Sequence, residues 1–263
     1  MNKILCSILI SNYNKEKYIK NCLESCINQT YENIEIIFAD NSSTDNSLNI
    51  LKEYPKIKTI KIERSTEFPA INQLQTLLKA LKVSKGQIIF LLDSDDFFNI
   101  DKVEKILQLY NKDQNKKFIC DIPNIVNKNS KKKFKYKKKF NVLTRWPTIF
   151  PTSSISLKRE FFFDLKNYLF ENEFTKLEID FRLNVLAYNI NKNYFIFSDN
   201  LSNYLKTNDG IMSRYFKFSP RWWKKRMEAH LYLKKLLEIN NLKHKLNLDY
   251  LVTKIINSFI TII

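Results

Sequence analysis

Three carboxylates lie within four consecutive positions, Asp93-Ser94-Asp95-Asp96, directly after the apolar run Ile88–Leu92. Like charges this close repel one another and raise one another's pKa unless a cation compensates them. Mg²⁺ or Mn²⁺ would compensate them, since both prefer oxygen ligands and complete their coordination with substrate phosphates and water. The segment therefore predicts a metal and diphosphate site. The alternative is an acidic helix start, in which Asp95 or Asp96 caps a helix beginning near Asn99.

Two further polar clusters also follow apolar runs. Ser11-Asn12-Tyr13-Asn14 comes after the first run of the chain, and the segment 40–45, with the sequence DNSSTD, comes after the second. In open parallel sheets, ligands bind beyond the carboxyl ends of the strands, where loops present side chains on a rigid platform. We therefore expect all three clusters to converge on one side of a sheet.

The elements that position these clusters follow from the hydrophobic pattern. Residues 3–11, 34–39 and 87–92 are near-continuous apolar runs and residues 56–62 alternate, while helical patterns occupy the stretches near 16–27, 44–53 and 71–83. Buried parallel strands have such continuous apolar runs because helices cover both faces of their sheet. The pattern predicts an α/β fold. Further helices are expected at 158–165 and 177–189, a strand at 193–198, and two amphipathic helices over 219–263.

Two stretches carry a family resemblance: SILISNYNKEKYIKNCLESCINQTYENIEIIFADNSSTDNSLNIL, and KGQIIFLLDSDDF further on. They resemble the family 2 glycosyltransferases in the order and spacing of an opening strand with a Tyr-Asn turn, a strand ending in an acidic turn, and a DxD strand. The resemblance is close over about residues 4–100 and looser to about residue 207. It implies a GT-A fold, a Rossmann-like and mostly parallel central sheet flanked by helices, over residues 1–215. Residues 216–263 would form a C-terminal helical extension.

The resemblance also implies roles for residues that match the family's motifs. Ser11 and Tyr13 correspond to the turn that packs against the nucleotide base, and Asp40 corresponds to the acid that hydrogen-bonds the base or ribose. Asp93 matches the first acid of the DxD motif, which faces the ribose or a metal-bound water. Asp95 matches the second, the direct ligand of Mn²⁺ or Mg²⁺.

Two features of the metal site stay undetermined: which aspartates bind the ion, and what completes its coordination. Asp96 is an alternate ligand to Asp95, and Asp93 belongs to the same metal site. Many family members carry a YRxH segment after the last strand, whose His can complete the metal shell. This chain reads Tyr204-Leu205-Lys206-Thr207 instead, so no His is available there, and Lys206 could supply positive charge in its place.

An inverting transfer also needs a base that accepts the proton of the acceptor hydroxyl. The family places an acidic pair at a helix start, and the matching segment here is Leu177-Glu178-Ile179-Asp180-Phe181-Arg182. We assign the base to Asp180. Glu178 is the alternative, because two positions on a helix point in different directions and one of them faces the site. Either acid could instead serve the helix dipole.

The sequence thus predicts an inverting, metal-dependent glycosyltransferase with a nucleotide-sugar donor, UDP-linked, and a glycan or lipid-linked acceptor. Bacterial surface polysaccharide or lipooligosaccharide synthesis is the expected setting. A basic nucleic-acid-binding protein that uses the run at Lys131–Lys139 is one alternative, although no nucleic acid partner is expected. A nucleotidyltransferase is another, but the chain has only two glycines and no Gly-rich phosphate loop.

The formal charge of +17 suits an anionic partner. The lysine run 131–139, a loop or exposed hairpin, and the apolar tail 251–260 predict peripheral contact with an anionic membrane. The alternative is that the tail docks on the catalytic domain and the lysines are only solvated. No run approaches the roughly 20 apolar residues of a membrane span. With four cysteines expected to be reduced, the predicted location is the cytoplasm, at the inner face of the cell membrane.

Overall fold

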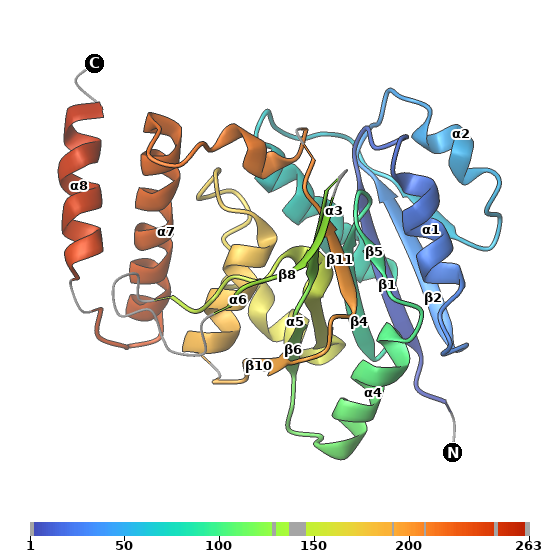
Figure 1. Ribbon diagram of the computed structural model, residues 1–263. Helices are drawn as coiled ribbons and strands as arrows, with labels where there is room; N and C mark the ends of the chain where they lie inside the picture. Colours follow the sequence, from blue (N-terminus) through green and yellow to red (C-terminus); the bar gives the residue numbers. More distant parts are fainter. Residues whose placement is uncertain are drawn as a thin grey trace.

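A seven-stranded sheet forms the centre of the molecule (Figure 1). The computed structural model describes residues 3–127, 130–136, 146–190, 192–207, 209–244 and 247–260. The strand order is β10-β6-β9-β4-β1-β2-β3, with β9 antiparallel to both neighbours and the other pairs parallel. Its strands are β1 (Cys6–Asn12), β2 (Ile34–Asp40), β3 (Lys58–Lys61), β4 (Ile88–Asp93), β6 (Phe118–Asp121), β9 (Ile155–Lys158) and β10 (Phe195–Phe197). The predicted mostly parallel sheet is confirmed.

Helices cover both faces of this sheet (Figure 1). One face packs against α3 (Pro69–Val83), α5 (Arg159–Lys166) and α6 (Ile179–Asn189), and α7 (Pro220–Ile239) packs on α6 and extends this core. The other packs against α1 (Ile19–Ile27), α2 (Ser47–Leu51) and α4 (Lys102–Lys112). Neighbouring residues of one strand point to opposite faces, so Leu91 belongs to the first core and Leu92 to the second. This double burial explains the near-continuous apolar runs.

A smaller sheet has the order β5-β11-β7-β8. Its strands are β5 (Phe97–Phe98), β7 (Asn124–Asn127), β8 (Ser130–Lys133) and β11 (Ser202–Leu205). The antiparallel pair β7 and β8 places Lys131–Lys133 on an exposed hairpin, one of the two forms expected for the lysine run. Lys137–Lys139 lie outside the described residues. The sequence pattern did not reveal this sheet, because its strands are two to four residues long.

The last two helices are α7 and α8 (Leu248–Ile260), which pack against each other. The helix α7 begins at Pro220 after Ser219, whose hydroxyl caps it by accepting from Trp222 N. Two short 3₁₀ helices, η1 (Thr152–Ser154) and η2 (Ile211–Arg214), precede β9 and α7. Within the described residues, no helix is both long and apolar enough to cross a membrane.

Candidate active site

The three polar clusters meet because β1 lies between β2 and β4. Asn12 pairs with Asp40 across one side of β1, and Ser11 pairs with Asp93 across the other. Side chains then link the strand ends: Asn12 Nδ2 donates to Asp40 Oδ1 over 2.9 Å, and Ser94 Oγ donates to Asn12 Oδ1 over 2.7 Å. The expectation that the clusters converge is therefore confirmed.

Asp93 is held as an acceptor at the end of β4. Its Oδ1 atom accepts hydrogen bonds of 2.7 Å from Ser11 Oγ and from Gln73 Nε2 of α3. Burial and the charge of Asp95 raise the pKa of Asp93 to about 6, against the lowering effect of these hydrogen bonds. Gln73 was not predicted from the sequence, since nothing in a helical pattern shows which residue faces a strand end.

Asp95 is paired with a lysine from the loop after β1. Lys15 Nζ lies 2.9 Å from Asp95 Oδ2 and 3.1 Å from Oδ2 of Asp209, which follows β11. Burial opposes the charge on Lys15, but the two carboxylates outweigh it and raise the pKa of Lys15. An ammonium group therefore compensates Asp95 where a divalent cation was expected.

Asp96 points into the protein. It is 1% exposed, and its carboxylate accepts hydrogen bonds from Ser153 Oγ and, over 2.7 Å, from the backbone N of Leu205. Burial, with the charges of Asp95 and Asp93, raises the pKa of Asp96 well above its ordinary value. Asp95 and Asp96 thus point in different directions, and Asp96 joins β4 to β11.

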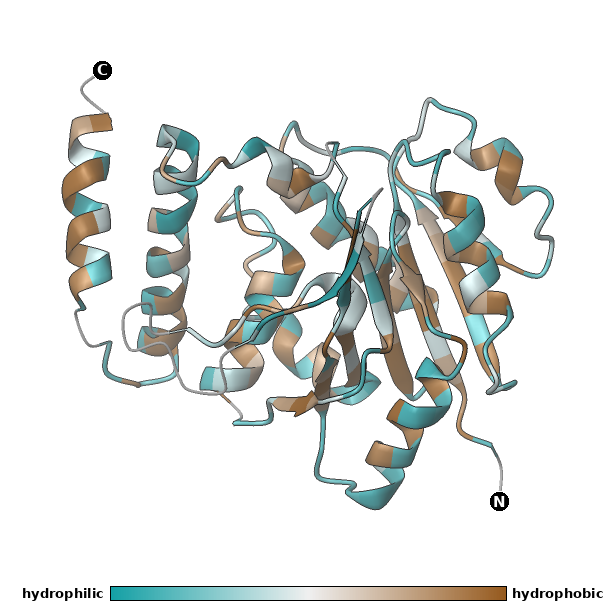
Figure 2. Ribbon diagram, in the orientation of Figure 1, coloured by the Kyte–Doolittle hydropathy of each residue, from teal (hydrophilic) through white to brown (hydrophobic). Residues whose placement is uncertain are grey.

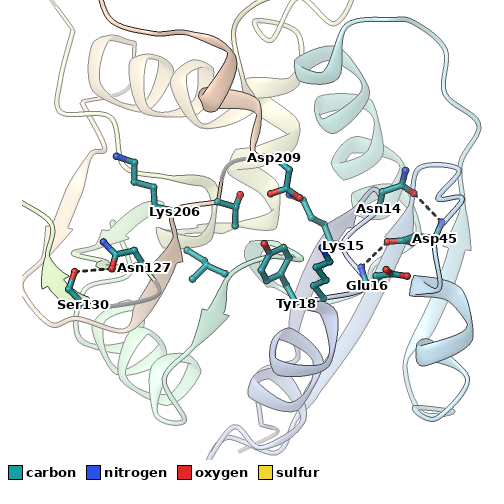
Figure 3. Close-up of a pocket in the computed structure, with 12 residues that line it drawn as sticks. Asn14, Lys15, Glu16, Tyr18, Asp45, Asn127, Ser130, Lys206 and Asp209 are labelled. Carbon is teal, nitrogen blue, oxygen red and sulfur yellow. Dashed lines mark hydrogen bonds and ion pairs between the residues drawn. The ribbon is translucent and has the colours of Figure 1, made fainter.

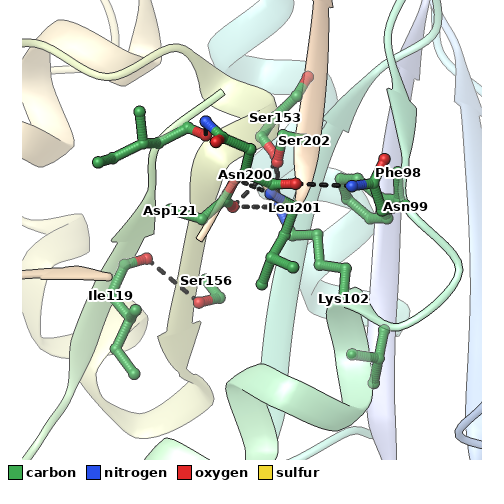
Figure 4. A network of polar contacts seen from close by, with 12 residues as sticks. Phe98, Asn99, Lys102, Ile119, Asp121, Ser153, Ser156, Asn200, Leu201 and Ser202 are labelled. Atoms are coloured by element: carbon green, nitrogen blue, oxygen red, sulfur yellow. Dashed lines mark hydrogen bonds and ion pairs between the residues drawn. The ribbon is translucent and has the colours of Figure 1, made fainter. Parts of the chain in front are cut away.

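A fully buried ion pair between Lys102 and Asp121 supports the acidic segment (Figure 4). Lys102 Nζ of α4 donates to Asp121 Oδ1 over 2.8 Å, and to Ser153 O and Ser202 Oγ over 2.6 Å each. Ser153 in turn donates to Asp96 and accepts from the backbone N of Asp93 over 3.1 Å. Lys102 therefore fixes the residue that orients both ends of the acidic segment.

Tyr13 lies under an arginine. The guanidinium carbon of Arg64 is 3.9 Å from the ring centroid of Tyr13, and Arg64 Nη1 donates to Asn41 Oδ1 over 3.2 Å. Tyr13 is 42% exposed, which leaves the ring accessible to a stacking ligand. Arg64 follows β3 at the same side of the sheet as the other clusters, and its place after a strand is the signal that could have identified it.

Asp40 is 1% exposed and shapes the turn after β2. Its Oδ1 accepts from Asn12, and its Oδ2 accepts from the backbone N of Ser43 over 2.9 Å. One lone pair on each oxygen stays available, but the burial of the side chain limits access to it. Asp40 therefore supports the turn that carries Asn41, and its expected contact with the base or ribose stays a prediction.

The acidic pair at the start of α6 divides into two environments. Glu178, the N-cap residue, forms an ion pair with Lys225 of α7. Asp180 lies in the first turn, where its Oδ1 accepts from the backbone N of Phe181 over 2.6 Å. Burial and the charge of Glu178 raise the pKa of Asp180 to about 7, Lys225 lowers it, and the charge of Asp93 adds to the rise. Asn184 of α6 donates to the backbone O of Asp180 over 2.7 Å and to that of Phe150 over 3.0 Å, which ties the start of α6 to the segment that leads into η1.

A pocket of about 810 Å³ opens beside Lys15 (Figure 3). Its lining comes from the loop after β1, the acidic turn, the β7–β8 hairpin and the segment after β11: Asn14, Lys15, Glu16, Lys17, Tyr18, Asp45, Asn127, Ser130, Leu205, Lys206, Thr207 and Asp209. Lys206, the residue expected to supply charge, is one of three lysines in this lining. The pocket therefore places positive charge next to the acidic segment.

Among the described residues, no group of three or more His, Cys, Asp or Glu is arranged to hold a metal ion. Asp95 nevertheless fits a cation that takes only one or two protein carboxylates and completes its shell with phosphates and water. Such a cation would bind together with a nucleoside diphosphate and would replace Lys15 at Asp95.

Curated relatives match the N-terminal part of the chain. An uncharacterized glycosyltransferase of Haemophilus influenzae is 40% identical over 110 residues, 41% of this chain and 42% of that protein. The UDP-Glc:alpha-D-GlcNAc-diphosphoundecaprenol beta-1,3-glucosyltransferase of Escherichia coli is 38% identical over 99 residues, 38% of each chain. The match thus spans less than half the length of these relatives.

Solved structures share the fold. S. aureus TarS in complex with UDP-GlcNAc has a TM-score of 0.62 at 17% identity, over 98% of this chain and 72% of that one. The mannosyltransferase of Pyrobaculum calidifontis, in complex with GDP-Man and Mn²⁺, has a TM-score of 0.58 at 14% identity, over 97% and 70%. The expected GT-A fold is confirmed. Because the model of the glycosyl transferase family 2 also matches residues 7–172, well over half of the sequence, this chain belongs to glycosyl transferase family 2.

Proposed function

We propose that this chain is an inverting glycosyltransferase that moves a sugar from a UDP-linked donor to a glycan or lipid-linked acceptor. One observation carries the proposal: in a family 2 chain, the acidic segment at the end of β4 meets the polar ends of β1 and β2 beside a pocket of about 810 Å³. Asp180, an acid whose pKa is raised to about 7, supports it as the candidate base. A metal or diphosphate site beside a carboxylate poised to take a proton is what this transfer requires.

The donor nucleotide stacks on Tyr13 in this proposal. In this structure Arg64 covers one face of the Tyr13 ring. When the base binds, Arg64 either stacks on it or moves away from the ring. Ser11 and Asp93 are already joined by a hydrogen bond of 2.7 Å and lie where the ribose would follow the base. Asp40 acts by holding the turn. Relatives and structural neighbours named for UDP-Glc and UDP-GlcNAc support a uridine donor.

Asp95, with Asp93, would hold Mn²⁺ or Mg²⁺ at the diphosphate. When bound, the metal ion supplies Lewis-acid stabilisation of the departing diphosphate. Lys15, released from Asp95, would pair with a phosphate oxygen, and Lys206 lines the same pocket. The structural neighbour with GDP-Man and Mn²⁺ supports a metal in this fold.

Asp180 is the base in this proposal. The backbone N of Phe181 donates a hydrogen bond to Oδ1 of Asp180. The other oxygen, Oδ2, accepts the proton of the acceptor hydroxyl in this proposal. The acceptor oxygen then forms a bond to the anomeric carbon as the bond from that carbon to the phosphate oxygen breaks, which inverts the anomeric centre. Glu178 is engaged by Lys225, and that pairing supports Asp180 over Glu178.

The acceptor class rests on relatives. One acts on a sugar linked to diphosphoundecaprenol, and another, 39% identical over 109 residues, is named a poly(ribitol-phosphate) beta-glucosyltransferase. Both names describe bacterial surface polymers or their lipid-linked precursors. We therefore place the reaction in bacterial surface polysaccharide or lipooligosaccharide synthesis, on the cytoplasmic side of the membrane where nucleotide sugars are available.

The test is donor binding by the purified chain. A ligand at about 100 times its Kd stabilises the folded state by about 2.7 kcal/mol, a rise of roughly 5–10 °C in Tm for a chain of this size. We expect that rise with UDP and Mn²⁺ together, a small one with Mn²⁺ alone, and a smaller one with GDP than with UDP. Hydrolysis of UDP-sugars then identifies the donor sugar.

The control separates the site from general effects of charge. Asp95→Asn should abolish the UDP and Mn²⁺ shift, while Asp113→Asn, which removes a surface acid paired with Lys116, should leave it unchanged. Absence of any shift with every common nucleoside diphosphate would remove the donor-site assignment.

A further inference from the structure

The last helix carries an exposed hydrophobic stripe. Leu248, Leu251, Val252, Ile255 and Phe259 are 67%, 45%, 39%, 58% and 64% exposed. Their spacing of three and four residues places all five on one side of α8. An apolar surface of this extent on a folded protein marks an interaction site.

The polar side of α8 is the one that packs. Asp249 forms ion pairs with Arg226 over 2.6 Å and with His230 over 2.7 Å, both on α7. Asn257 Nδ2 donates to Trp223 O over 3.0 Å, and Thr253 is fully buried between them. Amphipathic helices ordinarily bury the apolar side, and here the fixed contacts turn it outward, at one end of the molecule (Figures 1 and 2).

Aromatic and basic side chains are also exposed at the start of α7. Phe216 and Phe218 are 77% and 62% exposed, and the Nζ of Lys217 lies 4.7 Å from the ring centroid of Phe218. The Asn257–Trp223 bond joins this region to the end of α8. Residues 210–227 contain six basic residues and no acid: Arg214, Lys217, Arg221, Lys224, Lys225 and Arg226.

We propose that the α8 stripe, together with Phe216, Phe218, Arg221 and Lys224, binds the surface of an anionic lipid bilayer. Apolar and aromatic side chains enter the region of the headgroups, and the exposed cations pair with lipid phosphates. A second copy of the chain fits less well, because a symmetric contact would place the same cations opposite one another. The lysines of β8 are not needed for this contact.

The surface is connected to the candidate active site. Lys206, Thr207 and Asp209 line the pocket beside Lys15, and Phe216 follows seven residues after Asp209. On the proposed function, bilayer contact would hold this pocket beside lipid-linked acceptors. The binding itself requires neither donor nor activity, so it can be measured separately.

The experiment is sedimentation of the full chain with vesicles in the absence of nucleotide. Vesicles of phosphatidylcholine alone are compared with vesicles that contain about 30% phosphatidylglycerol. We expect binding to the anionic vesicles only, with an affinity that falls as salt rises. Binding to neither vesicle would overturn the proposal, as would equal binding to both.

Variants assign the binding to this surface. Ile255→Gln with Phe259→Gln should abolish it, and Arg221→Gln with Lys224→Gln should weaken it about fivefold for each cation removed. The control is Lys20→Gln with Lys56→Gln, two exposed lysines near α1 and α2 at the opposite end of the molecule (Figure 1), which should bind as the wild type does. Equal losses in the control pair would overturn the assignment.

Two further readouts distinguish membrane binding from unfolding and from self-association. All variants change exposed side chains, so their Tm values should match that of the wild type. A dimer in light scattering that dissociates on Ile255→Gln with Phe259→Gln, together with no vesicle binding, would assign the stripe to a subunit interface instead. UDP and Mn²⁺ stabilisation, measured without vesicles, reports on the proposed function alone.

Discussion

Lys15 Nζ lies 2.9 Å from Asp95 Oδ2, so the acid expected to bind a metal ion already has a cationic partner. Lys15 comes from the loop after β1 and Asp95 from the loop after β4, and the pairing of these two strands brings them together. The same ammonium group contacts Asp209. A metal ion must therefore compete with Lys15 for Asp95.

Replacing this lysine should strengthen metal binding. Lys15→Met leaves Asp95 without its cation, beside Asp93 and Asp96, so we expect Mn²⁺ to bind about tenfold more tightly without nucleotide, a difference of ~1.4 kcal/mol. Calorimetric titration measures it. Lys20→Met, which removes an exposed lysine of α1 outside the pocket lining, is the control and should leave Mn²⁺ affinity unchanged. Unaltered affinity in Lys15→Met would mean that Mn²⁺ does not bind at Asp95.

Replacing Asp180 should reduce activity, whereas replacing Glu178 should mainly reduce stability. Asp180→Asn should lower kcat by about 10²–10⁴-fold, the usual contribution of a general base, while the UDP affinity stays the same. Glu178→Gln should mainly reduce stability, since it breaks the pair with Lys225. Asp164→Asn, at an exposed position of α5, is the control. The opposite ranking, with activity lost in Glu178→Gln and retained in Asp180→Asn, would move the base to Glu178.

Activity should depend on pH through Asp180. A base must be deprotonated, so kcat/KM should fall about tenfold per pH unit below the folded pKa of about 7. A pH–rate profile tests this. A rate that stays flat over about three pH units around that pKa would argue that another group takes the proton.

The free energy of unfolding should depend on pH in the opposite direction to the activity. The pKa of Asp180 is higher in the folded chain than in the unfolded one, where the ordinary value is 3.8, so the folded state binds more protons between these values. The contribution of Asp180 to stability therefore falls as pH rises from about 4 to about 7. Asp180→Asn should be more stable than the wild type near pH 7, and the gain should shrink on acidification. Denaturation at several pH values measures both curves.

The buried ion pair should be needed for the fold. Lys102→Met leaves Asp121 charged and uncompensated in the core, which should cost about 3–5 kcal/mol in the free energy of unfolding. Lys105→Met removes a surface lysine that pairs with Asp101 and Asp199, and should cost less than about 1 kcal/mol. Urea unfolding compares the two. Similar losses in both variants would show that the interior tolerates an unpaired Asp121.

The sequence determined the strands β1–β4 and the acidic segment because these depend on neighbours along the chain. Near-continuous apolar runs indicate strands covered on both faces, and polar residues directly after them indicate strand ends. From β1, β2 and β4 alone it followed that Ser11, Asp40 and Asp93 would meet at one side of a sheet. The two C-terminal helices were likewise predicted, because residues 219–263 contain no turn glycine or interior proline.

Contacts between distant segments could be decided only by the tertiary structure. The sequence left Asp95 and Asp96 as alternatives, and the fold turns Asp95 toward Lys15 and Asp96 toward Ser153. Arg64 comes over Tyr13 because β3 ends beside β2. The sequence of α8 shows an apolar stripe, but it does not show whether that stripe packs against another helix or faces outward. Which side of a helix packs depends on what another helix offers, and α7 offers Arg226 and His230 to the polar side.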